Sequence, residues 1–295
     1  MICAYGVAAG NGKSMPNLEP AGVNGTKMDK RFARAGRTLA DSSATTATPA
    51  MAQIGVARVA RSRKPLFCGG TKPYAALTFD DGPTPVTNEL VKLLKDSGVS
   101  ATFFVLGAKL KDDRTTVKQM QSVGEIANHS WSHPAFNTLS SKGVKSEVND
   151  TQDLIRTVQR PPPELMRPPF GARDENVNRI LAKLGMAEAL WSSDTQDALN
   201  ASWQQIGETG VNGIGPGAII LMHDGKDTTL TALRKKILPA ARRQKIRFVT
   251  LSEMLAINPP SEQQLAAGAQ GCAHAGKVNV SGTYFKPSEQ LGYQP

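Results

Sequence analysis

The feature that most constrains the fold is a regular alternation of short apolar runs with longer amphipathic stretches, which begins at residue 74. The apolar runs have the length of buried strands, and they cover residues 74–79, 101–106, 125–128, 165–166, 186–191, 218–222 and 247–250. The stretches of helical period between them include residues 88–97, 142–159, 174–184 and 229–244. Alternating strands and helices are typical of parallel sheets, because each parallel pair needs a crossover connection. The sequence therefore predicts an α/β protein with either a parallel sheet or an α/β barrel.

The alternation divides the 295-residue chain into three parts. We expect residues 1–66 to be a basic segment that is disordered or acts as a linker, residues 67–260 to form one barrel-sized domain, and residues 261–295 to be a loosely packed tail. Residues 1–72 contain 11 basic and 3 acidic residues, whereas residues 73–260 contain 22 and 20. The basic excess is either a solvated tail or a means of attraction to an anionic envelope or polymer.

The termini and the cysteines bear on the cellular compartment of the protein. No apolar run approaches the roughly 20 residues that span a bilayer. Residues 1–10 have no basic region and too short an apolar core for a signal peptide, which we interpret as an incorrectly placed start codon. Cys68 and Cys272 flank the domain and are either free thiols or a disulfide, which would imply an oxidising compartment; Cys3 has no partner in either case.

Ionisable side chains follow the predicted strands at the point where each strand ends. They are Asp80 and Asp81, His129 and His133, Arg167, Asp194, and His223. In α/β barrels the C-terminal ends of the strands form the rim on which catalytic groups converge. Taken singly, the segments after Arg167, Asp194 and His223 could equally be a structural loop, a helix cap and a turn. Their shared position at strand ends predicts a common site.

The two histidines indicate a metal. His129 and His133 are four residues apart, and Pro134 favours a loop over a helix at this point. We favour a metal site over two surface histidines, because two histidines and one carboxylate leave positions open for water and substrate. The Asp80–Asp81 pair, on a turn forced by glycine and proline, is either a surface turn or a ligand with a free base beside it.

Together these segments resemble the polysaccharide deacetylase family, the nodulation-protein-B homology domain of the family-4 carbohydrate esterases. Five motifs match in the family's order over about residues 72–257. They are Thr-Phe-Asp-Asp-Gly-Pro at residues 78–83, His-Ser-Trp-Ser-His at 129–133, Arg-Pro-Pro-Phe-Gly at 167–171, Asp-Thr-Gln-Asp at 194–197 and Leu-Met-His at 221–223. The resemblance implies a distorted (β/α) barrel with about seven parallel strands.

The resemblance also implies roles for the residues near the metal. Asp81, His129 and His133 would hold one divalent cation, with Zn²⁺ expected and Co²⁺, Ni²⁺ or Mn²⁺ as alternatives. Asp80 would be the general base, and Arg167 would orient it and keep it ionised.

The remaining roles concern the leaving group and the substrate. His223 would be the general acid, with Asp194 setting its orientation and pKa. Phe170, Leu221 and Trp191 would contact the substrate, Leu221 by lining the pocket for the acetyl methyl group, and the backbone near Phe170 would help to hold the oxyanion. One departure is Ala198, where the family usually has tryptophan; it puts substrate choice in doubt.

The resemblance thus implies an enzyme that removes acetyl groups from N-acetylated sugars of a peptidoglycan-like or chitin-like polymer. We expect a monomer in the cell envelope or outside the cell, with no nucleic-acid partner. Three alternatives remain: an esterase for O-acetyl groups such as those of xylan, a non-catalytic sugar-binding module, and a non-haem iron oxygenase with the same ligand triad.

Overall fold

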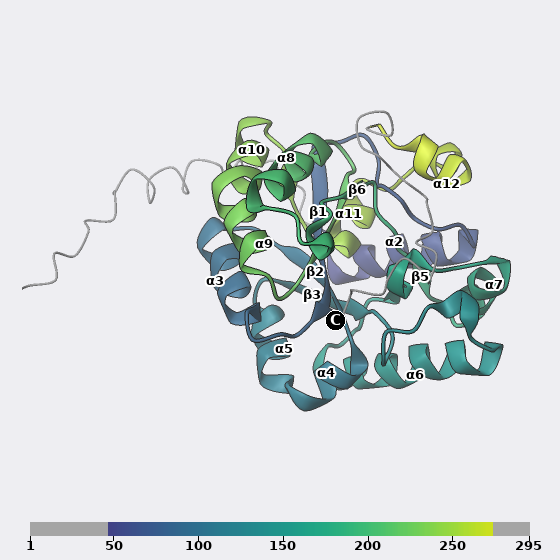
Figure 1. Cartoon of the computed structure of the whole chain (residues 1–295). Coiled ribbons are helices and arrows are strands. Elements are labelled where there is room, and N and C mark those ends of the chain that lie inside the picture. Colours follow the sequence, from purple (N-terminus) through teal and green to yellow (C-terminus); the bar gives the residue numbers. More distant parts are fainter. Residues whose placement is uncertain (1–46, 274–295) are drawn as a thin grey trace, which may run out of the picture. The chain divides into compact units, whose positions relative to one another are not determined.

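Strand β1 (Tyr74–Gly82) is the centre of the sheet and is buried along almost its whole length. The computed structural model describes residues 47–273. β1 pairs in parallel with β2 (Ala101–Val105) and β7 (Ile219–His223), and its first two residues pair with β8 (Arg247–Phe248). The other strands are β3 (Gly124–Asn128), β4 (Leu165–Met166), β5 (Ala187–Glu188) and β6 (Ser193–Asp194). The order β5-β4-β3-β2-β1-β7-β6 confirms the predicted distorted barrel: seven parallel strands form a curled half-barrel (Figure 1).

Helices connect the strands or flank the curled sheet (Figure 1). They are α2 (Pro49–Ser62), α3 (Thr87–Ser97), α4 (Gly107–Asp112), α5 (Arg114–Met120), α6 (Ser141–Val158), α7 (Glu175–Lys183), α8 (Trp203–Gly213), α9 (Asp227–Ala232), α10 (Leu238–Arg243), α11 (Leu251–Ile257) and α12 (Glu262–Ala267). Among the residues described, no helix is both long enough and apolar enough to cross a bilayer.

The two faces of β1 enter different cores, because successive side chains of a strand point to opposite sides. Leu77 and Phe79 pack in a core with α3, α5 and the helices that follow β6 and β7. Ala76 belongs to a second core, in which the interior of the half-barrel packs against α2 and α11. Thr78 and Asp80 share the face of Ala76, so the alternation directs Asp80 toward the interior.

The predicted boundary at residue 66 is wrong. Residues 49–62 form helix α2, whose first turn is capped by the Thr48 side chain, and Val56 and Val59 are buried in the interior core. A Cβ atom at Gly55 would lie 2.7 Å from the Leu255 carbonyl carbon, so only glycine permits the close approach of α2 to α11. The remainder of the predicted linker, residues 1–46, lies outside the described residues.

The predicted tail is in part a structured element. α12 buries Leu265, and a disulfide joins Cys272 to Cys68, which is one of the two alternatives that the sequence left open. The bond ties the segment that follows α12 to the strand-like segment before β1. Residues 274–295 lie outside the described residues, and so does Cys3.

Candidate metal centre and active site

A bulge at the end of β1 brings two consecutive aspartates into one site. The pairing with β2 shifts between Asp80 and Gly82, so that Asp81 is the extra residue, and Asp81 has a φ of 72°. Regular strand geometry would send neighbouring side chains to opposite faces. Both carboxylates are instead buried beside the same histidines, at 3% and 2% exposure.

The structure brings Asp81, His129 and His133 together as a group that could hold a metal ion. One ligand atom from each lies within 4.8 Å of the others. Asp81 Oδ1 is 3.5 Å from His129 Nε2 and 3.3 Å from His133 Nε2. Both carboxylate oxygens of Asp81 are buried without a hydrogen-bond partner, which a bound cation would supply.

The protonation of these groups suits a cation. Burial lowers the pKa of His129 to about 3 and that of His133 to about 2, so both rings are neutral at pH 7. Burial raises the pKa of Asp81 to about 6, which leaves its carboxylate mostly ionised at pH 7. His129 Nδ1 lies 2.7 Å from the Arg167 carbonyl oxygen, so Nδ1 carries the proton and Nε2 is free for a metal. The residues therefore fit a divalent cation.

The loop that carries the two histidines is fixed by hydrogen bonds to its backbone. Ser130 Oγ accepts from the His133 amide at 3.0 Å, and the Glu147 carboxylate on α6 accepts from the amides of Trp131 and Ser132 at 2.8 Å each. The loop conformation predicted from Pro134 is thus observed, with His133 at a φ of 63°. Nothing in the sequence singled out Glu147, because only the fold places α6 against this loop.

Arg167 is fully buried and holds Asp80 on the side of the carboxylate away from His129. Arg167 Nη1 donates to Asp80 Oδ1 at 2.6 Å, while Asp80 Oδ2 is 3.6 Å from His129 Nε2. The carbonyl oxygens of Ala189 and Leu190 accept from the same guanidinium group at 3.1 Å each. Burial raises the pKa of Asp80, and the charge and hydrogen bond of Arg167 oppose that rise.

His223 is paired with Asp197, not with Asp194 as predicted. His223 Nδ1 is 2.7 Å from Asp197 Oδ1, and the His223 amide donates to Asp197 Oδ2 at 2.8 Å. Asp194 instead accepts from the Gln196 amide at 2.8 Å. Gln196 adopts a left-handed conformation, with a φ of 58°, and this turn after β6 carries Asp197 beneath His223.

The ion pair determines the charge of His223. Burial opposes the imidazolium, but the charge and hydrogen bond of the fully buried Asp197 outweigh it and raise the pKa of His223 to about 9. Thr229 also donates to Asp197, at 2.7 Å. His223 is therefore cationic at neutral pH, and its charge also acts on Asp80 and Asp81 across the site.

The three predicted substrate contacts lie on the same rim. The Phe170 ring is 4.4 Å from the His133 ring between centroids, and Phe170 has a φ of 60°. Trp191 lies 5.6 Å from the Arg167 guanidinium carbon and against Gly171. Leu221 is buried on β7, in register with Asp194.

The position of the missing family tryptophan is half-buried and lies next to an exposed residue. Ala198 lies in the turn Asp197–Leu199, and its carbonyl oxygen accepts from Lys226 Nζ at 3.0 Å. Leu199 is 56% exposed at this turn. Trp203 begins α8 and lies 4.7 Å from Lys235 Nζ, so its ring contacts the helices on the outside of the sheet.

The α/β half-barrel carries a cluster of two histidines and one aspartate on its C-terminal rim, with a second buried aspartate and a cationic histidine beside it. This arrangement defines a class of metal-site hydrolase. The polysaccharide deacetylase family model matches residues 69–189. A peptidoglycan-N-acetylglucosamine deacetylase of Bacillus cereus is 34% identical over 187 residues, which are 61% of this chain and 87% of that protein. The chain belongs to the polysaccharide deacetylase family.

Other relatives are longer than this chain. The peptidoglycan-N-acetylmuramic acid deacetylase PdaC of Bacillus subtilis is 36% identical over 181 residues, 61% of this chain, but the chain covers only 38% of PdaC. It covers 24% of the bifunctional xylanase/xylan deacetylase of Cellvibrio japonicus, with 35% identity over 55% of this chain.

The solved structure of the Bc1960 peptidoglycan N-acetylglucosamine deacetylase matches with a TM-score of 0.62 and 30% identity, over 65% of this chain and 92% of that one.

Proposed function

We propose that this protein is a metal-dependent deacetylase that hydrolyses N-acetyl groups on the sugars of a peptidoglycan-like or chitin-like polymer. The observation that carries the proposal is the buried Asp81 carboxylate, whose two oxygens accept no hydrogen bond from the described residues and which faces two neutral histidines. Asp81, His129 and His133 would hold the cation, with Zn²⁺ the expected ion for two imidazoles and one carboxylate. When bound, the cation would polarise the acetyl carbonyl and acidify a water molecule beside it.

Asp80 is the proposed general base. It lies beside the ligands, at 3.6 Å from His129 Nε2, and Arg167 holds one of its oxygens at 2.6 Å. The other oxygen is therefore directed toward the cluster. It would take the proton of the water whose oxygen forms the new bond to the acetyl carbon, and the backbone near Phe170 would donate to the resulting oxyanion.

His223 is the proposed general acid. The amine is a poor leaving group until it is protonated, and an imidazolium is the donor that this step requires. Asp197 keeps His223 in that form, with a pKa of about 9. Breaking the carbon–nitrogen bond with transfer of this proton to nitrogen gives acetate and a free amino sugar.

The relatives support the polymer class. They include proteins named as deacetylases of peptidoglycan and of chitooligosaccharide. A polymer of this kind, together with the Cys68–Cys272 disulfide, favours the cell envelope or the extracellular space.

The test is acetate release from purified peptidoglycan, chitin oligomers and acetylxylan, with and without a chelator and after Zn²⁺ is added back. We expect release from at least one N-acetylated polymer that is lost with the chelator and restored by the metal. Release from acetylxylan alone would favour the second candidate, an O-acetyl esterase, which the xylan deacetylase relative supports. Release that the chelator leaves unchanged would refute the metal site.

A further inference from the structure

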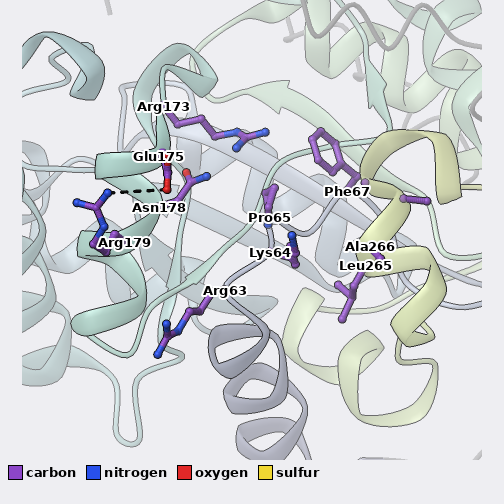
Figure 2. Close-up of a pocket in the computed structure, with 12 residues that line it drawn as sticks. Arg63, Lys64, Pro65, Phe67, Arg173, Glu175, Asn178, Arg179, Leu265 and Ala266 are labelled. Carbon is purple, nitrogen blue, oxygen red and sulfur yellow. Dashed lines mark ion pairs between the residues drawn. The ribbon is translucent and has the colours of Figure 1, made fainter.

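A cavity of about 610 Å³ lies beside β5, between the C-terminal end of α2, the N-terminal half of α7, and α12 (Figure 2). Its size is that of a small-ligand site. Four of its lining side chains are cationic: Arg63, Lys64, Arg173 and Arg179. Glu175 is the acidic residue in the same lining.

Two of these four cations have an acidic neighbour, and the other two have none among the described residues. Arg179 Nη2 is 4.0 Å from Glu175 Oε1, and Arg173 Nε is 3.3 Å from Glu188 Oε1. Within residues 47–273, no ion pair involves Arg63 or Lys64. Arg63 and Lys64 come from the basic N-terminal segment, whereas residues 73–260 contain nearly equal numbers of basic and acidic residues. A concave, cationic site attracts anions.

Arg173 is held in place before any ligand binds. Its guanidinium group is 5.9 Å from the centre of the Phe67 ring, and its side chain is 17% exposed. With the Asn178 amide oriented to satisfy both neighbours, Asn178 accepts from Arg173 Nη1 at 3.1 Å and donates to Glu188 Oε2 at 3.0 Å. A fixed guanidinium loses little conformational entropy when it binds an anion.

The opposite wall is apolar. Pro65, Phe67, Leu265 and Ala266 line it (Figure 2). The disulfide between Cys272 and Cys68, which directly follows Phe67, ties the α12 segment to this wall. The cavity therefore combines cationic groups with a flat apolar surface of the kind that contacts the C–H face of a sugar ring.

The cavity is also linked to the metal centre by one short loop. Phe170 contacts the metal-site histidine His133, and Arg173 follows three residues later in the same loop. Three residues span at most about 11 Å. The rim of the metal centre and the lining of the cavity therefore approach each other along this loop.

From this arrangement we infer that the cavity is a subsite for a repeat unit of the polymer substrate that carries a free carboxylate. Arg63 and Lys64 would bind the carboxylate, and the Phe67 wall would contact the sugar ring. The inference rests on the proposed deacetylase function, because the ligand is taken to be part of the same polymer. It narrows the substrate class to acidic glycans such as peptidoglycan, in contrast to neutral chitin.

The test measures binding directly, with soluble peptidoglycan oligomers that carry free carboxylates and with the same oligomers after amidation. The test variant is Arg63→Gln/Lys64→Gln. The matched control is Arg61→Gln/Lys183→Gln, which removes two exposed charges outside the cavity, one from α2 and one from α7. We expect the Kd for the acidic oligomers to rise about five- to tenfold in the test variant, to change less than about twofold in the control, and to rise with salt in the wild type.

Amidated oligomers should bind the wild type and the test variant equally. Equal loss in the control variant, or equal affinity of the wild type for acidic and amidated oligomers, would overturn the subsite. Kinetics separate this inference from the proposed function: the test variant should raise KM for the acidic polymer and leave kcat and the turnover of chitin oligomers unchanged. A wild-type protein that binds acidic oligomers with this discrimination but releases no acetate would retain the subsite and refute the deacetylase.

Discussion

Replacing Asp197 with asparagine should convert His223 from a cationic to a mostly neutral side chain at pH 8. The shift of its pKa from 6.5 to about 9 corresponds to about 3 kcal/mol in favour of the imidazolium. Burial opposes the charged form, so without the carboxylate the pKa of His223 should fall to 6.5 or below. At pH 8 less than about 3% of the rings would then be protonated, compared with about 90% in the wild type.

The assay is the pH dependence of acetate release from an N-acetylated oligomer. If His223 protonates the amine, Asp197→Asn should lower the rate at least about thirtyfold at pH 8 and much less at pH 6, and should move the basic limb of the profile to lower pH. An activated acetyl ester, whose leaving group needs no proton, should be hydrolysed at nearly the wild-type rate.

The matched control is Asp194→Asn. Asp194 accepts from the Gln196 amide and acts on His223 through its charge, so the basic limb should move much less in this variant than in Asp197→Asn. A basic limb that moves in Asp194→Asn and not in Asp197→Asn would refute the assignment of Asp197. Equal losses on the amide and the activated ester would refute the role of His223 as the acid.

The remaining predictions concern the metal, the base, the disulfide and the His223 pair. His129→Ala should lose the metal with little change in fold, as measured by metal content and circular dichroism, and full occupancy would contradict the ligand set. Asp80→Asn should retain the metal but lower the rate by about two to four orders of magnitude, and a smaller loss would contradict its role as the base. Cys68→Ser should lower the free energy of unfolding by at most about 5 kcal/mol, from the 204-residue separation of the bonded cysteines, and chemical denaturation that gives no decrease would contradict this estimate. Because the pKa of His223 is raised in the fold, its pairing should contribute fully to stability below pH 6.5, and this contribution should disappear as the pH rises through about 9; the difference in unfolding free energy between the wild type and Asp197→Asn, measured against pH, checks the sign.

The order of the apolar runs, and the ionisable residues that follow them, were enough to predict the class of fold and the location of the site. Parallel strands end on one rim, so Asp81, His129 and Arg167, each after a different apolar run, had to converge there. The motif spacing was sufficient to place the three residues of the candidate metal site, because each of them lies within a few residues of a buried strand. The apolar period does not detect β6, which is a two-residue strand of serine and aspartate.

The partner of His223 and the helical conformation of residues 49–62 depend on the tertiary structure. Asp194 and Asp197 are both acidic and three residues apart. The left-handed turn at Gln196 places Asp197, and not Asp194, against His223 Nδ1. The sequence of helix α2 is basic and weakly periodic, which predicts a linker. It is helical because Val56 and Val59 pack against α11. In both cases the deciding interaction joins segments far apart in the chain, and a local pattern does not contain the free energy of such contacts.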